Sequence, residues 1–271
     1  MTWDVTPAER LRSVTRRGVA DHVLAAEAAG ALAGFASEPA SLVVACRRVL
    51  AHHRAHGALW WVCARILAAP EPNVAAREAM ASLDADRTAN RLAATLPLLD
   101  DGDLVATIGW PHAVDEALAE RQDIAVLSVR VEGVDAFGDL RYRQTDRNVP
   151  VVDVWDIEAL ALLLVPAFAI GPDRTLVPAG TDALLRDLGG RARDVWLVGG
   201  VGRVLPARLF DAARTAAEHV DEMLDPEEAA PDVVSLERID RIAGPRGVEL
   251  PTDAAARIDC PIVPELLRPL D

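Results

Sequence analysis

The sequence predicts an α/β protein in which an N-terminal helical subdomain is followed by a Rossmann-like, mostly parallel sheet flanked by helices. Up to residue 96, apolar residues recur at helical spacing without strand-like alternation. Beyond Pro97, short apolar runs alternate with helical patterns, which is typical of buried parallel strands joined by crossover helices. We therefore expect a helical domain at residues 1–97 and a Rossmann-like α/β domain at residues 98–271, which ends in a proline-rich tail.

Proline, glycine and aspartate mark the expected helix boundaries of the N-terminal domain. Pro7 can open a first helix, and Asp21 can cap a second one. Gly57 and Pro70 then end two further helices, because glycine and proline terminate helical segments. These helices, and the long one that follows them, are predicted over residues 39–56, 59–69 and 74–95.

The second part of the chain is predicted to hold buried strands joined by helices. The strands are expected at residues 104–108, 124–131, 149–154, 162–167 and 195–198. The helices are expected at residues 113–120, 181–188 and 206–224. Residues 132–148 contain glycines and many charges, so we expect a loop or a truncated helix there. The tail from residue 233 onward is broken by prolines, and we expect it to wrap the sheet edge or a partner subunit.

Composition excludes several classes of function. A formal net charge of −14 disfavours direct binding to nucleic acid, whose phosphates require a basic surface. The chain has no lysine, so Schiff-base chemistry and a P-loop lysine are excluded. No apolar run approaches the ~18 residues of a membrane span. Because the N-terminal residues also lack the apolar core of a secretory signal, we expect a cytoplasmic protein that does not bind membranes.

The cysteine and histidine patterns do not predict a metal or a cofactor. Cys46, Cys63 and Cys260 are odd in number and lack CxxC spacing, so free buried thiols are expected. His52 and His56 are four residues apart, but no suitably spaced acidic residue accompanies them. We therefore expect neither a metal site nor a bound cofactor.

Ligands of parallel sheets bind beyond the carboxyl ends of the strands, and the first strand-end loop contains Gly109, Trp110 and His112. Gly109 permits close approach of a ligand to the backbone. Trp110 offers a stacking face, or it packs inside the protein. His112 can carry a proton or donate a hydrogen bond.

Two later loops are candidates for holding an anion. Gly180 and Thr181 open a helix, so their amides and the threonine hydroxyl can seat an anion, although helix capping explains them equally well. Residues 199–203 follow a strand and superficially match a dinucleotide fingerprint, but Leu205 stands where the last glycine is needed. A phosphate-binding or flexible loop with Arg203 as its cation is still possible.

The order of these parts resembles the initiation factor 2B alpha/beta/delta family, which includes methylthioribose-1-phosphate and ribose-1,5-bisphosphate isomerases. The resemblance covers residues 18–264 and rests on the helical N-terminal region, the strand ending at Gly109, the Val-Pro-Ala-Phe-Ala-Ile run of residues 165–170, and Gly180 with Thr181. It implies that Arg130, at the end of the second strand, matches an arginine that grips phosphate in relatives.

The chain departs from the family at the residues that perform isomerisation. The resemblance implies a cysteine after the first sheet strand, where this chain has Gly109 and Trp110, and an acid/base aspartate where it has Phe168. The Asn-Lys pair expected before Gly180 and Thr181 is also absent. Acid/base groups each contribute roughly 10²-fold to 10⁴-fold to catalysis, so their loss predicts a non-catalytic member.

Two classes of function follow from this resemblance. The first is a non-catalytic protein that binds a small phosphorylated sugar or nucleotide, or that serves in a regulatory assembly as a homodimer or a related hetero-oligomer. The alternative is a sugar-phosphate isomerase-like enzyme in which His112 and either Asp153 or Asp173 transfer protons. The predicted ligand-binding residues are Gly109, Trp110, His112, Arg130, Phe168, Gly180, Thr181 and Arg203.

Overall fold

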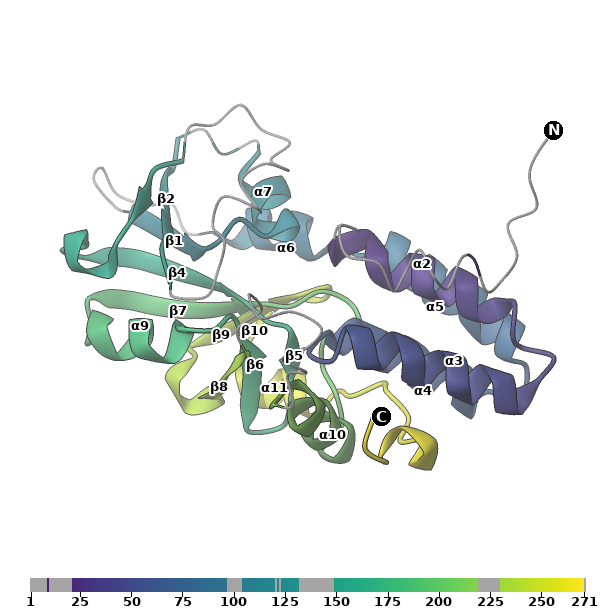
Figure 1. Cartoon of the computed structure of the whole chain (residues 1–271). Coiled ribbons are helices and arrows are strands. Elements are labelled where there is room, and N and C mark those ends of the chain that lie inside the picture. Colours follow the sequence, from purple (N-terminus) through teal and green to yellow (C-terminus); the bar gives the residue numbers. More distant parts are fainter. Residues whose placement is uncertain are drawn as a thin grey trace. The chain divides into compact units, whose positions relative to one another are not determined.

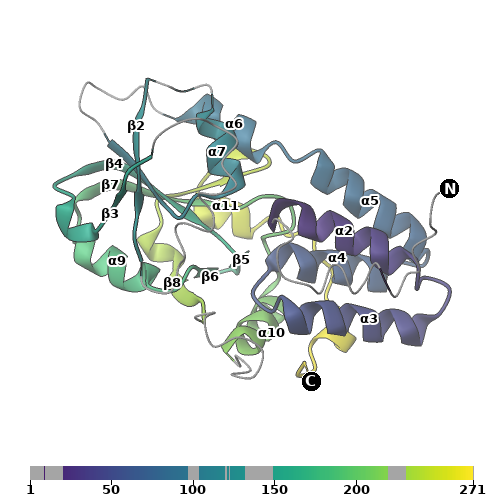
Figure 2. The same cartoon turned by 45° about the horizontal axis from the view of Figure 1, so that its top comes forward.

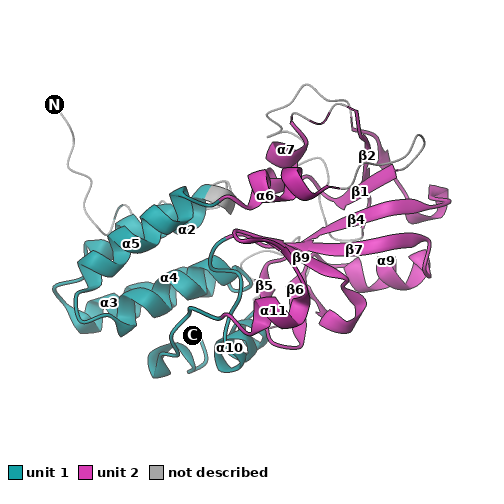
Figure 3. Ribbon diagram, turned by 180° about the vertical axis from the view of Figure 1, so that it is seen from behind, with its two compact units in different colours: residues 1–86, 201–217, 258–271 teal, residues 87–200, 218–257 magenta. Residues whose placement is uncertain are grey.

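The computed structural model describes residues 9, 21–96, 104–119, 121, 123–131, 149–218 and 230–270. It divides into two compact units (Figure 3). The helical unit comprises Met1–Asp86, Val201–Ala217 and Ile258–Asp271, and the sheet unit comprises Arg87–Gly200 and Glu218–Arg257. The sequence analysis divides the chain once, near residue 97, whereas here the helical unit also takes up two later segments. Gly202 packs against one of its helices, and Arg47 donates hydrogen bonds to the carbonyls of Glu265 and Arg268.

Four helices in succession form most of the helical unit (Figure 2). They are α2 (Asp21–Ala33), α3 (Pro39–His52), α4 (Gly57–Ala68) and α5 (Pro72–Asp84). Pro39 and Pro72 occupy the first helical positions, where the missing N–H costs nothing. Helix α4 is buried almost throughout, from Gly57 to Ala64 and at Ile66. A helix that is apolar on all sides is suited to the centre of such a bundle.

The prediction of one continuous helix over residues 74–95 is wrong. Helix α5 ends at Asp84, and a separate helix α6 (Thr88–Thr95) follows. The carboxylate of Asp86, in the break, accepts a hydrogen bond of 2.8 Å from the amide of Val201. The aspartate side chain therefore satisfies the backbone of a distant segment, and aspartate is a poor residue for a helix interior.

The sheet unit is built on a seven-stranded sheet with the order β10-β9-β7-β4-β1-β2-β3. All neighbouring strands are parallel except β10 and β9. The five predicted strands are present, although β3 is reduced to two residues. Residues 241–249 of the tail extend the sheet rather than wrapping its edge. The strands are β1 (Leu104–Ile108), β2 (Ala125–Val129), β3 (Val151–Val152), β4 (Leu160–Pro166), β7 (Ala192–Val198), β9 (Arg241–Gly244) and β10 (Gly247–Glu249).

Helices cover both faces of this sheet, as the α/β prediction requires (Figure 1). Helices α6 and α7 (His112–Leu118) pack on one face, where Leu92 and Val114 join a buried cluster with Leu164 and Trp196. Helix α9 (Thr181–Leu188) lies on the opposite side and has the bounds that the sequence predicts. The predicted fold class is therefore confirmed.

Several elements were not predicted. A second, antiparallel sheet has the order β5-β6-β8 and joins residues near 170 to residues near 233. Its strands are β5 (Ala169–Ile170), β6 (Arg174–Val177) and β8 (Asp232–Ser235). The other elements that were not predicted are α11 (Pro251–Ala255) and the 3₁₀ turns η1 (Val154–Asp156), η2 (Leu236–Arg238) and η3 (Pro264–Leu266). Helix α10 (Ala207–Glu218), by contrast, lies within the helix predicted at residues 206–224. The loop expected at residues 132–148 and the helix start at Pro7 lie outside the described residues.

In the described part of the chain, no helix combines the length and the apolar character that a membrane crossing requires.

Gly202 gives a direct test of how the helical unit is packed. Its φ is +77°, and a Cβ atom there would lie 3.0 Å from the Trp61 ring and 3.1 Å from the Ala58 Cα. We expect Gly202→Ala to lower the free energy of unfolding by about 2–4 kcal/mol, because left-handed strain and overpacking add. Urea unfolding measures this difference.

Gly190 is the matched control, because its φ is +86° and nothing lies within 4 Å of a Cβ atom placed there. Gly190→Ala should lower the free energy of unfolding by only about 1–2 kcal/mol, the strain alone. Equal losses in the two variants would show that Gly202 is not required for packing.

Candidate functional site

The carboxyl ends of the strands bring together several residues of the predicted site. From β1 the chain continues to β2 and β3 on one side, while β4 pairs with the other side of β1. The strand order therefore switches between β1 and β4, where ligand crevices of open parallel sheets form. Gly109 and Trp110 follow β1, Arg130 follows β2, and Phe168 follows β4.

Trp110 is a packed residue and not an exposed stacking face. Its side chain is 4% exposed and belongs to the cluster between the sheet and helices α6 and α7. Its indole N–H donates a hydrogen bond of 2.8 Å to the carboxylate of Asp115, which is 2% exposed. Gly109, with φ of +63°, makes the turn that sends Trp110 into the core, and its carbonyl accepts from the Ser128 hydroxyl at 3.0 Å. Of the two interpretations of Trp110, packing is the one that this geometry favours.

His112 begins helix α7, and its side chain pairs with a residue of the same helix. Its Nε2 atom lies 3.6 Å from a carboxylate oxygen of Glu116, one turn further on. The two side chains are partly exposed, so the pair is worth little for stability. The alternative enzyme requires a shared proton path from His112 to Asp153 or Asp173, and each of these aspartates has an arginine as its closest ionic partner.

Arg130 and Asp153 form an ion pair across the ends of two neighbouring strands. The Arg130 Nε atom lies 3.5 Å from an oxygen of Asp153, and both side chains are more than half exposed. The Arg130 amide also donates to the carbonyl of Val152, which fixes the backbone at this position. The guanidinium therefore stands at the strand ends and is more than half exposed.

Phe168 and Asp173 belong to the small antiparallel sheet. Phe168 is half-buried, and its amide donates to the carbonyl of Leu176 at 2.8 Å, so it begins the β5–β6 hairpin. Asp173 lies in the turn of that hairpin and accepts hydrogen bonds from Arg174 at 2.9–3.3 Å. These hydrogen bonds lower the pKa of Asp173, so its carboxylate is ionised and poorly suited to act as a general acid.

The helix start at Gly180 and Thr181 is already satisfied by the protein. Gly180 is left-handed with φ of +81°, and the buried Thr181 hydroxyl donates to the Pro178 carbonyl at 2.5 Å. The next amide, of Asp182, donates 2.7 Å to the carboxylate of Asp232 in β8. An anion seated on this turn would therefore have to displace a carboxylate of the chain, which makes capping the main role of these residues.

The glycine-rich loop at residues 199–203 spans the boundary between the two units. Gly199 continues the sheet, since its amide donates to Ala243 at 2.9 Å. Val201 and Gly202 belong to the helical unit, where they contact Asp86 and Trp61. Arg203, the predicted cation, is half-buried in the same unit. The backbone of this loop is thus used for packing and capping.

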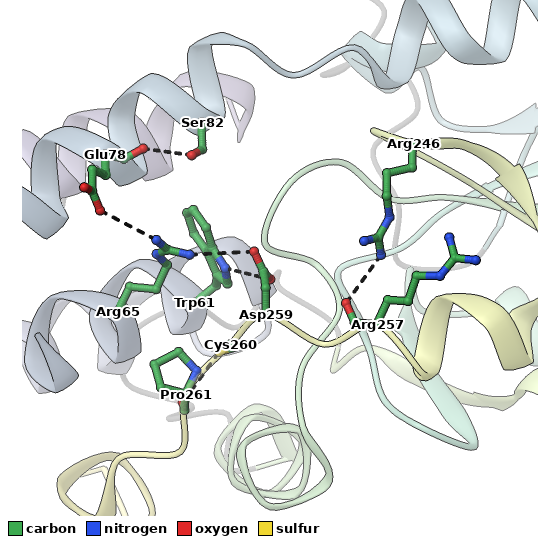
Figure 4. A network of polar contacts seen from close by, with 9 residues as sticks. All are labelled: Trp61, Arg65, Glu78, Ser82, Arg246, Arg257, Asp259, Cys260 and Pro261. Carbon is green, nitrogen blue, oxygen red and sulfur yellow. Dashed lines mark hydrogen bonds and ion pairs between the residues drawn. The ribbon is translucent and has the colours of Figure 1, made fainter.

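The helical unit contains a cleft that the sequence analysis missed (Figure 4). It has a volume of about 460 Å³ and lies between α4, α5 and residues 258–261. The Arg65 guanidinium stacks 5.1 Å from the Trp61 ring and lies 3.9 Å from Glu78 and 3.7 Å from Asp259. The Trp61 indole N–H also donates to Asp259 at 3.2 Å. Because Arg65 and Asp259 are distant in sequence, no local pattern could reveal this network.

The chemistry of this cleft indicates a structural contact. Two carboxylates flank its one lining arginine, so the cleft has no excess positive charge with which to attract phosphate. Burial, and secondarily the charge of Asp259, raise the pKa of the Cys260 thiol to about 12, so this thiol is protonated and unreactive at neutral pH. The network instead fastens residues 258–261 to helices α4 and α5.

Among the described residues, no group of three or more histidine, cysteine or acidic side chains is arranged to hold a metal ion. His52 ends helix α3 and His56 precedes helix α4, so the two do not share one helix face.

The hydrogen bond between Trp110 and Asp115 can be tested directly. We expect Trp110→Phe to lower the free energy of unfolding by about 1.5–3 kcal/mol, because it removes a donor from a buried carboxylate. Trp155→Phe is the control, since the Trp155 side chain is 72% exposed and should change stability by less than about 0.5 kcal/mol. If both variants unfold at the same urea concentration as the unaltered protein, the hydrogen bond does not stabilise the fold.

Comparison with known proteins agrees with this architecture. No model of a protein family and no curated protein sequence matches the chain. The translation initiation factor eIF-2B of Pyrococcus horikoshii OT3 superimposes with a TM-score of 0.68 at 15% identity, over 91% of this chain and 98% of the other. The tetrameric eIF2B-beta2-delta2 complex of C. thermophilum gives a TM-score of 0.62 at 13% identity, over 92% of this chain and 93% of the other.

An enzyme has a similar structure as well. The 5-methylthioribose 1-phosphate isomerase of Pyrococcus horikoshii OT3 gives a TM-score of 0.56 at 14% identity, over 93% of this chain and 86% of the other. Likeness at these identities extends to the fold and not to the activity. The resemblance predicted from sequence is thereby confirmed, and the chain has the fold that eIF2B subunits share with this isomerase.

Proposed function

We propose that this protein is a non-catalytic, initiation factor 2B-like protein that binds a small phosphorylated sugar or nucleotide with Arg130. The exposed guanidinium of Arg130 at the carboxyl end of β2 carries the proposal. Arg130 directly follows β2, the strand that pairs with β1 in the described sheet unit. Its weak partner, Asp153, can be displaced by a phosphate that accepts bidentate hydrogen bonds.

The absence of catalysis is supported by the side chains that occupy the neighbouring strand ends. Trp110 and Phe168 stand at the ends of β1 and β4, and neither can transfer a proton. His112 pairs with Glu116 and Asp153 pairs with Arg130, so the alternative isomerase-like enzyme lacks a preformed acid/base pair. The three cysteines are free and buried, in keeping with a protein of the reducing cytoplasm.

Binding of phosphorylated compounds tests the proposal. We expect isothermal titration calorimetry to detect binding of ribose 5-phosphate or adenosine monophosphate. Arg130→Gln should weaken that binding about 10-fold to 100-fold, the scale of a charge-assisted hydrogen bond. NMR spectra of the same samples should show the compound unchanged.

Arg174→Gln is the matched control, because Arg174 is also about half exposed and also pairs with a neighbouring aspartate. The Arg174→Gln variant should bind the phosphorylated compound with the same affinity as the unaltered protein. Equal loss in both variants would mean that general charge, rather than Arg130, attracts the ligand. Conversion of an aldose phosphate into a ketose phosphate would favour the isomerase alternative. If neither compound binds, the ligand proposal is wrong, and a role in a regulatory assembly is the function that is still supported.

The assembly proposal concerns a homodimer or a related hetero-oligomer. The structurally similar eIF2B-beta2-delta2 complex is a tetramer, which supports association through this fold. We expect light scattering of the purified protein to give about twice the chain mass of 29.0 kDa. A mass equal to that of one chain would contradict the homodimer.

A further inference from the structure

The most exposed large apolar side chain among the described residues is Trp155, at 72%. It lies in the 3₁₀ turn η1, which directly follows the edge strand β3. The other described tryptophans are buried, with exposures of 8% or less. Tryptophan is enriched among the residues that dominate binding to protein partners.

The backbone beneath Trp155 is held rigidly. Val154 and Ile157, on either side, are buried and anchor the turn in the sheet unit. The Arg191 guanidinium donates to the carbonyls of both residues and also to the carbonyl of Asp187 in α9. The backbone that carries the indole is therefore held in place, so a partner would not have to order the turn upon binding.

Acidic side chains surround this indole. Asp153, Asp156 and Glu158 are all exposed within three residues of Trp155. Asp153 pairs with Arg130, whereas Asp156 and Glu158 have no ion pair among the described residues. The turn therefore presents an apolar aromatic surface within a negatively charged rim.

We propose that the Trp155 turn, residues 153–158, docks a basic, arginine-bearing segment of a partner protein. A guanidinium can stack on the indole while the carboxylates of Asp156 and Glu158 pair with neighbouring positive charges. The chain's net charge of −14 accelerates the encounter with such a partner. This surface adjoins the proposed phosphate site, because Asp153 pairs with Arg130, but it uses the Trp155 indole, Asp156 and Glu158 in place of Arg130.

The same charges disfavour other occupants. A second copy of the chain would bring a second set of these carboxylates to the interface, and like charges repel. A phosphate placed on the indole itself would be repelled by Asp156 and Glu158, whose charges no cation among the described residues offsets. A purely apolar partner would leave the negative charges of Asp156 and Glu158 at the edge of the interface without a positive partner.

Fluorescence quenching tests the proposal on the intact chain. In a Trp3→Phe background, since Trp3 lies outside the described residues, acrylamide should quench Trp155 preferentially because the other indoles are buried. We expect a peptide of alternating glycine and arginine to protect Trp155 from quenching, and a peptide of alternating glycine and glutamate to have no effect. Protection by both peptides, or by neither, overturns the proposal.

Variants separate the indole from general charge. Binding of the labelled arginine peptide, measured by fluorescence anisotropy, should weaken about tenfold in Trp155→Leu and less in Trp155→Phe. The double variant Asp156→Asn/Glu158→Gln should bind more weakly and with a smaller dependence on salt. Thermal unfolding checks that each variant is folded.

Glu27→Gln/Asp84→Asn removes the same charge from exposed positions of the helical unit and should leave the affinity unchanged. Equal weakening in the two double variants overturns the proposal, because net charge alone would then explain binding. Dissociation of a homodimer by Trp155→Leu also overturns it, since a second copy would then cover the turn.

Discussion

The pairing of β1 with β4 determines where everything else in the sheet unit lies. Val105, Ala106 and Thr107 face Leu162, Leu163 and Leu164 in register, and each of these residues is at most 1% exposed. Because the chain leaves β1 toward β2 but returns on its other side as β4, the loops after these two strands diverge. A sheet of this kind opens a crevice where the loops separate, and no other point of the sheet has this property.

The side chains at that divergence determine which chemistry is available. The Trp110 indole packs in the buried cluster and donates its N–H to Asp115, so packed side chains fill the end of β1. The helix start at Thr181 is satisfied by its own chain, through Pro178 and Asp232. The Arg130 guanidinium, after β2, is more than half exposed and pairs with the carboxylate of Asp153.

The sequence predicted elements whose signals are local. Helix α9 was placed correctly because Gly180 permits the left-handed turn that starts it, and β1 because its apolar run is short and bounded. The small sheet of β5, β6 and β8 was missed because its strands have two to four residues and because β8 pairs with β6 across more than fifty positions. The break after Asp84 was missed because the contact found there, between Asp86 and Val201, is a tertiary one. Likewise, both interpretations of Trp110 were possible until its neighbours were known.

The helical unit is assembled from segments that leave the ribosome at very different times. Helices α2 to α5 emerge early, but the residues that Arg47 and Trp61 hold, from Asp259 to Arg268, emerge some two hundred positions later. Contacts of such large sequence separation form slowly, because a long loop must close first. During synthesis the α4 residues that finally meet Gly202 and Asp259 therefore lack these contacts until those residues have left the ribosome, and apolar surface that is exposed in such an interval favours aggregation.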